Sequence, residues 1–479
     1  MAHKAPVHFD RAGEARVGVT APARERWGWA LYDFANTIFS MNVASLYFGV
    51  WLVADLHASN TVYALGNVIA SVLVFLAIPV LGAVSDSRRR RKKWVVGFAL
   101  ASGFACMAIG VLGYTTVPMV GQEVLGAATV AADWRPGFTD LAWVFAAFVL
   151  ANFAYQAAMP FYNAMLPELV PASEQGRMSG IGVAMGYVGS IVGVLLVVPF
   201  FTGSIPVVGQ INESVMGVLR LIPFTDRAGR VSTFVPTGLL FMVFTLPLIF
   251  FCRDHDPVPS PSPIRWRDSF GEVATTLKEA RKHPGVLRFI LTTFLYQDAV
   301  GTIIGFMAVY AVRAVGFERG SETTLFIVLT VPAVLGSYIY GRLSDRWGPK
   351  RALSWTLLVW VLLLLLMIAA PTQNMFWVVG IMIGLNFGGV NAVERPLLLS
   401  LVPDVSAGRY FSLMLLSARA AAIVGPLIWS LTVDSLEGPL GTRVAYRIAV
   451  GVVAAMFLGA WWLLRGVPDR RPGTAVRAV

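Results

Sequence analysis

The charged stretch GAVSDSRRRRKK, residues 82–93, follows a long apolar run and returns in the second half of the chain, so it carries the strongest information about the fold. Its second copy is GRLSDRWGPKR, residues 341–351, which also lies between two apolar runs. Each copy contains a glycine, three further residues, an aspartate and then a group of basic residues. A short charged loop repeated between apolar runs predicts paired membrane-spanning helices in a duplicated chain.

Apolar runs of membrane-spanning length recur along all 479 residues. The chain is 56% hydrophobic and 14% charged, whereas soluble domains carry about 25% charged residues. Most of the surface must therefore face something other than water. We predict an all-α membrane protein in which twelve transmembrane helices form two six-helix pseudo-repeats around a central cavity. The predicted spans are residues 27–54, 61–84, 94–114, 140–165, 178–201, 236–252, 288–312, 324–341, 353–370, 376–400, 410–432 and 444–465.

The spans divide into an N-terminal half, residues 27–252, and a C-terminal half, residues 288–465. The linker at 253–287 opens with DPVPSPSP and contains SFGEVATTLKEARKH, residues 269–283, which has the spacing of a short amphipathic helix. Tails at 1–26 and 466–479 complete the chain. Most of the 38 lysines and arginines lie in the tails, the linker and the short loops of one side. The positive-inside rule then predicts that both tails and the linker are cytoplasmic, and it explains the net charge of +11 without a nucleic-acid partner.

Two further matches relate the halves. VPASEQGR at 170–177 resembles VPDVSAGR at 402–409, and DFANTI at 33–38 in the first span resembles DAVGTI at 298–303 in the seventh. Each match falls at the same place in its half, as a diverged duplication would leave it. Parallel repeats of this kind are a transporter architecture.

The repeated charged loop resembles the cytoplasmic loop motif of the major facilitator superfamily. The resemblance implies alternating access and a cytoplasmic gate in which an aspartate and basic residues form a network. The first copy lacks the second glycine that Gly348 supplies in the other. The alternative is that these loops only fix topology. Carried over, the gate residues are Gly82, Asp86, Arg90, Arg91, Gly341, Asp345, Lys350 and Arg351.

A narrower resemblance lies in WALYDFANTIF, residues 29–39, and YNAMLPELVPASEQGRMSGIGVAMGYVG, residues 162–189. These stretches resemble the vacuole-effluxer branch of the superfamily, whose fungal members export amino acids from the vacuole. The resemblance implies the fold over nearly the whole chain and favours amino acids as the substrate.

Five charged residues lie inside the predicted spans: Asp33, Asp298, Glu394, Arg395 and Arg419. Charges within a membrane are costly and are usually paired or functional. Three acids against two bases leave one carboxylate without an obvious partner, which is a candidate proton or cation site. Asp33 is the preferred coupling residue because its neighbours are polar. The alternative is a structural or gating cluster of ion pairs.

Polar residues on two helix faces are candidates for contact with the solute. They recur at helical spacing in the fourth and tenth spans, and hydrogen bonds between helices are the alternative explanation. The glycines between 180 and 193 favour close helix packing over a role in binding. The polar candidates, besides the charged residues, are Tyr32, Asn36, Asn152, Tyr155, Gln156, Asn163, Gln297 and Asn391.

Motifs of other functional classes are absent from the sequence. It has no phosphate-binding G-x-x-x-x-G-K-[ST] loop, no H-E-x-x-H and no G-x-S-x-G. We expect no catalytic residue, no metal and no cofactor. We therefore predict a proton-coupled secondary transporter of a small polar organic solute, acting as a monomer in the inner membrane of a bacterial cell. The alternatives are a cation-coupled sugar or glycoside symporter and, from another class, a membrane-embedded enzyme.

Overall fold

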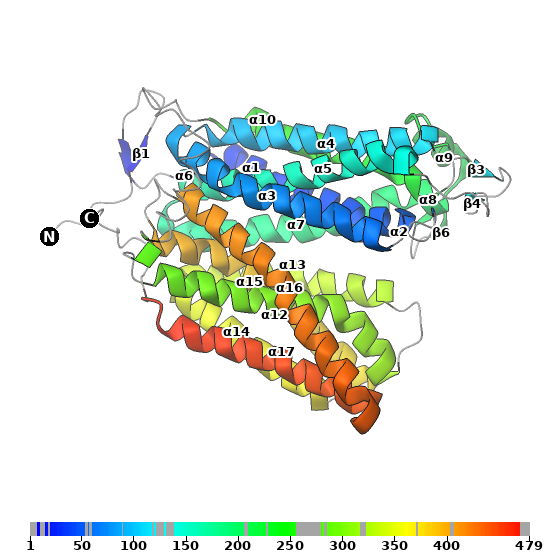
Figure 1. Cartoon of the computed structure of the whole chain (residues 1–479). Coiled ribbons are helices and arrows are strands. Elements are labelled where there is room, and N and C mark those ends of the chain that lie inside the picture. Colours follow the sequence, from blue (N-terminus) through cyan, green and yellow to red (C-terminus); the bar gives the residue numbers. More distant parts are fainter. Residues whose placement is uncertain are drawn as a thin grey trace.

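The computed structural model describes residues 7–9, 15–17, 20–52, 56, 60–88, 90–116, 119–120, 129–130, 138–205, 209–226, 229–254, 278, 280–281, 285–316, 322–369, 372–402 and 407–469. Long helices dominate these residues and run roughly side by side (Figure 1). Seven of the helical segments are long and apolar enough to cross a membrane. The chain is therefore an integral, multi-pass membrane protein.

The N-terminal half contains six long helical segments. They are α1 (Ala23–Phe39), which continues through η1 (Ser40–Tyr47) into α2 (Phe48–Val50), α3 (Asn60–Arg88), α4 (Arg91–Thr116), α5 (Phe138–Ala164), α7 (Gln175–Val197), which continues into α8 (Pro199–Thr202), and α10 (Phe234–Phe251). Short helices connect them: α6 (Leu166–Leu169), η3 (Ala172–Glu174), α9 (Glu213–Leu219) and η4 (Arg230–Thr233).

The C-terminal half also contains six. They are α12 (Val286–Tyr310), which continues into η5 (Ala311–Val315), α13 (Glu322–Trp347), α14 (Pro349–Ala369), α15 (Gln373–Leu401), α16 (Ala407–Leu440) and α17 (Thr442–Arg465). Each of the twelve predicted spans thus coincides with a long helical segment over its described residues, with α16 longer at its C-terminal end than the predicted 410–432. Of the linker, the structure describes 253–254, 278, 280–281 and 285–287. Residues 278, 280 and 281 fall in the predicted amphipathic helix and are helical, and the rest of that helix lies outside the described residues.

Three small antiparallel strand pairs accompany the helices and were not predicted. They are β1 (Val7–Phe9) with β2 (Ala15–Val17), β3 (Met119–Val120) with β4 (Thr129–Val130), and β5 (Ser204–Ile205) with β6 (Gly209–Gln210). Each strand has two or three residues, so the pairs close loops rather than build a sheet.

The predicted internal repeat has a structural counterpart. The hydroxyl of Thr37 donates to the backbone oxygen of Asp33 at 2.8 Å, and the hydroxyl of Thr302 donates to that of Asp298 at 2.8 Å. The first helix of each half also ends in a π-helical segment, η1 or η5. The two halves therefore share local geometry as well as sequence.

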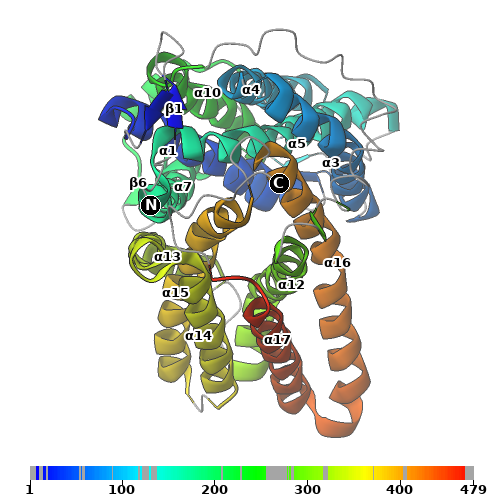
Figure 2. The same cartoon turned by 90° about the vertical axis from the view of Figure 1, so that its left-hand side faces the viewer.

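Two sets of contacts join the halves. Helix α7 packs against α13 and α15, and α16 packs against α3 and α5. In Figure 1 the ribbons of the two halves lie close together at the end where the termini are marked and diverge toward the opposite end. Figure 2, viewed from the first end, places α7 between α1 and α13.

Glycines permit the close approach of α7 and α13. A Cβ on Gly180 would lie 3.1 Å from the Cα of Gly341, and a Cβ on Gly341 would lie 2.6 Å from the backbone oxygen of Gly176. A side chain has no room at these positions unless the helices separate. The packing role predicted for the glycines of α7 is therefore confirmed at Gly180.

Candidate functional site

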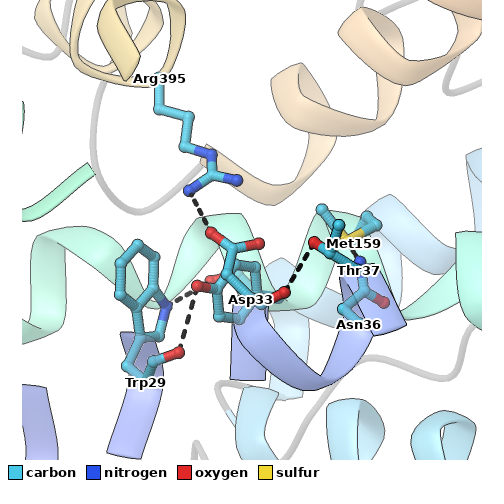
Figure 3. A network of polar contacts seen from close by, with 7 residues as sticks. Trp29, Asp33, Asn36, Thr37, Met159 and Arg395 are labelled. Atoms are coloured by element: carbon cyan, nitrogen blue, oxygen red, sulfur yellow. Dashed lines mark hydrogen bonds and ion pairs between the residues drawn. The ribbon is translucent and has the colours of Figure 1, made fainter. Parts of the chain in front are cut away.

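An ion pair between the halves lies at the centre of the site. Asp33 of α1 and Arg395 of α15 approach to 3.0 Å between Oδ2 and Nη1, and their exposed fractions are 5% and 7% (Figure 3). The guanidinium also lies 5.7 and 5.5 Å from the ring centroids of Trp29 and Tyr162. A buried arginine thus has a carboxylate and two aromatic faces as partners, which offset the loss of water.

Trp29 and Tyr162 hold the Asp33 end of the pair in place. The indole nitrogen of Trp29 donates to the backbone oxygen of Tyr162 at 3.1 Å, and the Tyr162 hydroxyl donates to the backbone oxygen of Trp29 at 3.2 Å. Their rings stack with centroids 4.6 Å apart. These reciprocal contacts fix α1 against the end of α5 one turn before Asp33 (Figure 3).

A second acidic group, Glu394, lies next to Arg395 in sequence. Its Oε2 accepts hydrogen bonds from the hydroxyl of Tyr296 at 2.9 Å and from Nε2 of Gln297 at 2.8 Å. These two donors come from α12, so the contact is internal to the C-terminal half. One turn earlier on α15, Nδ2 of Asn391 donates to the hydroxyl of Tyr187 on α7 at 2.9 Å, which joins the two halves.

The third acid, Asp298 of α12, has no charged partner among the described side chains. It is 1% exposed, its Oδ1 accepts the backbone N–H of Gly425 at 2.8 Å, and its Oδ2 has no hydrogen-bond partner. The internal repeat shows why no arginine stands opposite Asp298 at the place that corresponds to Arg395. Arg395 lies seven residues before VPDVSAGR, and the residue seven before VPASEQGR is Asn163. The position that would match the arginine therefore carries a neutral amide, whose Oδ1 is also buried without a partner.

One prediction about the charged residues needs revision, and another concerns a side chain that is not described. Asp33, the preferred candidate for the carboxylate without a partner, does have one, because α15 brings Arg395 to it from the other half of the chain. Sequence spacing does not reveal such a contact between residues 362 positions apart. The side chain of Arg419 lies outside the described part of the structure.

The polar residues predicted in α5 bond mainly within the N-terminal half. Nε2 of Gln156 donates to Oδ1 of Asn152 at 3.0 Å, and the ring of Tyr155 lies 5.3 Å from that of Phe39. The first of these contacts is internal to α5, and the second packs α5 against α1, which fits the alternative role of holding helices together for Tyr155.

The polar neighbours of Asp33 on α1 are only partly satisfied. Nδ2 of Asn36 donates to the sulfur of Met159 at 3.3 Å, but its Oδ1 has no partner. The hydroxyl of Tyr32 is buried without a partner, and its ring lies 4.9 Å from that of Tyr162. Buried polar atoms that lack partners mark places where water or a solute can bind.

A third contact between the halves occupies the predicted gate. Asp345, beyond the predicted span 324–341 at the end of α13, accepts the backbone N–H groups of Gly176 and Arg177 at 2.7 Å each. These amides open α7, where the helix dipole favours a negative charge. Burial nevertheless raises the pKa of Asp345 to about 6, although the two amides and the Arg177 charge lower it. The carboxylate therefore joins the halves through backbone donors.

The predicted basic members of the gate have other partners in this structure. Nζ of Lys350 donates to the backbone oxygen of Arg465 at 3.1 Å, and Arg351 pairs with Asp469 at 2.8 Å. In this arrangement the loop therefore turns both residues toward α17 and Asp469, and their role in the gate stays a prediction.

The first copy of the loop motif is partly described. Arg91 is buried and pairs with Glu168 at 2.6 Å within the N-terminal half, and Arg90 is exposed. Gly82 and Asp86 lie in α3, and their side chains are outside the described residues. The Glu168 partner and the aromatic frame of Trp29, Tyr162, Tyr187 and Tyr296 were not predicted as site residues.

Comparisons with known proteins identify the family. The family described as "Vacuole effluxer Atg22 like" matches residues 53–465. An uncharacterized MFS-type transporter, YxiO, of Bacillus subtilis (strain 168) is 25% identical over 437 residues, which cover 90% of this chain and 93% of that protein. Multidrug resistance protein MdtG of Serratia proteamaculans (strain 568) is 24% identical over 316 residues, with 65% and 68% covered.

Solved structures share the fold. A bacterial homologue of the iron transporter ferroportin in an outward-facing state gives a TM-score of 0.63 at 15% identity, with 92% of this chain and 98% of that chain covered. The major facilitator superfamily transporter FucP in an outward conformation gives 0.62 at 13% identity, with 91% and 98% covered. At this identity the likeness concerns the fold alone, and it is the fold predicted from the repeats. Family and fold are those of transporters and not of enzymes, and the chain belongs to the Atg22-like vacuole effluxer family of major facilitator transporters.

Proposed function

We propose that this transporter carries amino acids by alternating access. The observation that supports the proposal is the buried Asp33–Arg395 pair between the halves. Arginine binds carboxylates through two parallel hydrogen bonds, and a nearby carboxylate suits an ammonium group. A zwitterion is therefore a better match for this site than a neutral solute.

The mechanism is an exchange of partners. The carboxylate of the solute competes with Asp33 for the guanidinium of Arg395, and the released Asp33 faces the ammonium group. Glu394, with its donors Tyr296 and Gln297, supplies a second acidic position beside Arg395. Because Asp33 and Arg395 belong to different halves, binding that replaces their contact changes the free energy difference between open and closed arrangements.

Within this proposal, Asp298 is the residue that couples solute transport to a proton or cation. Its Oδ2 is buried and has no partner among the described residues, and the repeat places Asn163 where Arg395 stands in the other half. An unpaired carboxylate in apolar surroundings is best neutralised by a bound proton or cation. We expect Asp298→Asn to keep solute exchange but to lose accumulation driven by a proton gradient, whereas Glu394→Gln weakens both.

We also propose how the protein is oriented in the membrane. With both termini in the cytoplasm of a bacterial cell and the protein in its inner membrane, the end where α7 meets α13 is cytoplasmic. The Asp345 contact then closes the cytoplasmic side of the transporter.

Counterflow in liposomes tests the substrate. Purified protein is reconstituted with an unlabelled amino acid inside, and entry of the labelled compound is followed for a panel of amino acids and sugars. We expect exchange of one or more amino acids and its loss in Arg395→Lys, which keeps the charge but not the fork of donors. Exchange of sugars that rises with sodium, and no exchange of amino acids, would instead favour the cation-coupled sugar symporter.

A further inference from the structure

A hollow lined by basic residues lies at the end of the molecule where α7 packs against α13, which we call the joined end. Its volume is about 230 Å³, and its lining residues belong to α1, α7 and α13. The side chains that define its chemistry are Arg26, Trp27, Arg177, Met178, Tyr338 and Arg342.

Three arginines line the hollow, and none of its described lining residues is acidic. Arg177 has a partner, Glu174, at 3.1 Å. The guanidinium of Arg342 lies 4.8 Å from the ring centroid of Tyr338. Nε of Arg26 is buried and has no hydrogen-bond partner. Two guanidinium groups are thus left without a carboxylate partner among the described residues, and one of them has an unsatisfied donor.

An apolar stripe leads along α13 to the hollow. Val331, Leu335 and Ile339 are 51%, 61% and 43% exposed, and Tyr338 is 38% exposed. They precede Arg342 on one face of the helix, at the spacing of successive turns. On the other side of the hollow, Trp27 is 52% exposed, and tryptophan is enriched at the level of lipid headgroups. In a bilayer, exposed apolar side chains on a spanning helix contact acyl chains, and a tryptophan at the helix end places the hollow near the headgroups.

We propose that the hollow binds the phosphate of an anionic phospholipid of the adjacent leaflet. The arginines supply charge-assisted donors to the phosphate oxygens, and the α13 stripe contacts the acyl chains. A soluble anion would bind the arginines but would not contact the apolar stripe on α13. The stripe therefore favours a lipid as the ligand.

The bound lipid acts as a clamp between the halves. Arg26 and Arg177 belong to the N-terminal half and Arg342 to the C-terminal half, and Arg177 also donates its backbone N–H to Asp345. A headgroup held by both halves requires the arrangement in which α7 and α13 touch. Mass action then makes this closed arrangement more populated as the anionic lipid content rises.

The test uses the full-length protein in nanodiscs of phosphatidylcholine, with and without phosphatidylglycerol. Retained lipid is measured by native mass spectrometry, and the separation of the joined ends is measured between spin labels on α7 and α13. Arg26→Gln and Arg342→Gln remove the two arginines without a carboxylate partner. Arg465→Gln is the matched control, since Arg465 lines a second basic hollow that lies within the C-terminal half alone, with Lys350 and Arg351.

We expect the wild type to retain phosphatidylglycerol and to shift toward the closed separation, and each of the two variants to weaken retention about fivefold. The double variant should lose the shift, while Arg465→Gln keeps it. Equal loss of the shift in Arg465→Gln would overturn the proposal, because it would mean that only general surface charge matters. Occupation of the hollow by inorganic phosphate, with no preference for the lipid, would also overturn it.

Discussion

Asp33 and Arg395 are buried charges that each depend on the other. Removing one partner leaves the other unpaired, which costs about 3–5 kcal/mol, whereas removing both leaves no charge to compensate. We predict that Asp33→Asn lowers the thermal stability of the protein markedly and that Asp33→Asn with Arg395→Gln recovers most of the loss. Thermal unfolding in detergent measures the first effect, and counterflow measures transport, which the double variant should still lack. A double variant less stable than both single variants would contradict the pairing.

The raised pKa of Asp345 predicts that the contact between α7 and α13 responds to pH. Its pKa is about 6 in the closed arrangement, against an ordinary value of 3.8. The arrangement with the higher pKa binds the proton more tightly, so acidification favours it. We predict that lowering the pH from 7 toward 5 increases the population in which the ends of α7 and α13 touch, and that raising it again reverses the change.

Distances between spin labels at these two ends measure this response. Glu174 and Arg177 lie near the carboxylate, so Asp345→Asn serves as the control that should abolish the effect. A change in the opposite direction, or an unchanged response in Asp345→Asn, would exclude Asp345 as the group responsible.

Which residues belong to the site was easier to predict from the sequence than which residues they contact. The in-span charges were identifiable because a charge within twenty apolar residues stands out. Trp29, Tyr162 and Tyr296 were not, because aromatic residues are abundant in apolar spans and give no local signal. The two mutual backbone contacts of Trp29 and Tyr162 depend on how α1 crosses α5, which sequence spacing leaves open.

At the scale of elements, the close packing of α7 on α13 limits what can replace its glycines. A Cβ on Gly180 would meet the backbone oxygen of Ser337 and lie 3.1 Å from the Cα of Gly341. We predict that Gly180→Ala separates the two helices, lowers the closed population and slows transport. Gly97→Ala on α4 is the matched control, because a Cβ there has nothing within 4 Å.

The control also separates packing from helix propensity. An alanine in place of a helical glycine stabilises the helix by about 1 kcal/mol, so Gly97→Ala should unfold at a slightly higher temperature with normal counterflow. Slower counterflow in both variants would point to a general effect of the substitution, and normal counterflow in Gly180→Ala would show that the packing is not limiting.

The existence of the long helices was predictable from the sequence, whereas the residues at which they end and the short strands between them were not. The hydrophobic runs required helices because backbone groups in a bilayer must bond internally. The extension of α16 to Leu440 was missed because Asp434 and Glu437 end the apolar run while the helix continues. The strand pairs were missed because strands of two or three residues have no periodicity to detect.

At the scale of the whole molecule, the repeat predicted the two halves but not their relative placement. Matching motifs fix which helices correspond, and the shared Asp–Thr contacts agree with them. Which end of the molecule is joined depends on two contacts, Asp33–Arg395 and Asp345 with the start of α7, that link residues from opposite halves. Such contacts belong to one arrangement among those that alternating access requires, so a repeated sequence does not select between them.

The orientation decides which compartment the joined end faces. Gln210 is exposed in β6, in the connection between α8 and α9, and Ser260 lies in the linker. Both native cysteines, Cys106 and Cys252, are buried, so single cysteines introduced at 210 and 260 can be labelled against a low background. We predict that a membrane-impermeant maleimide added to intact cells labels Gln210→Cys and not Ser260→Cys, which should react only after the cells are opened. The opposite pattern would place the contact of Asp345 with α7 on the outside, and the structure would then be the arrangement that opens to the cytoplasm.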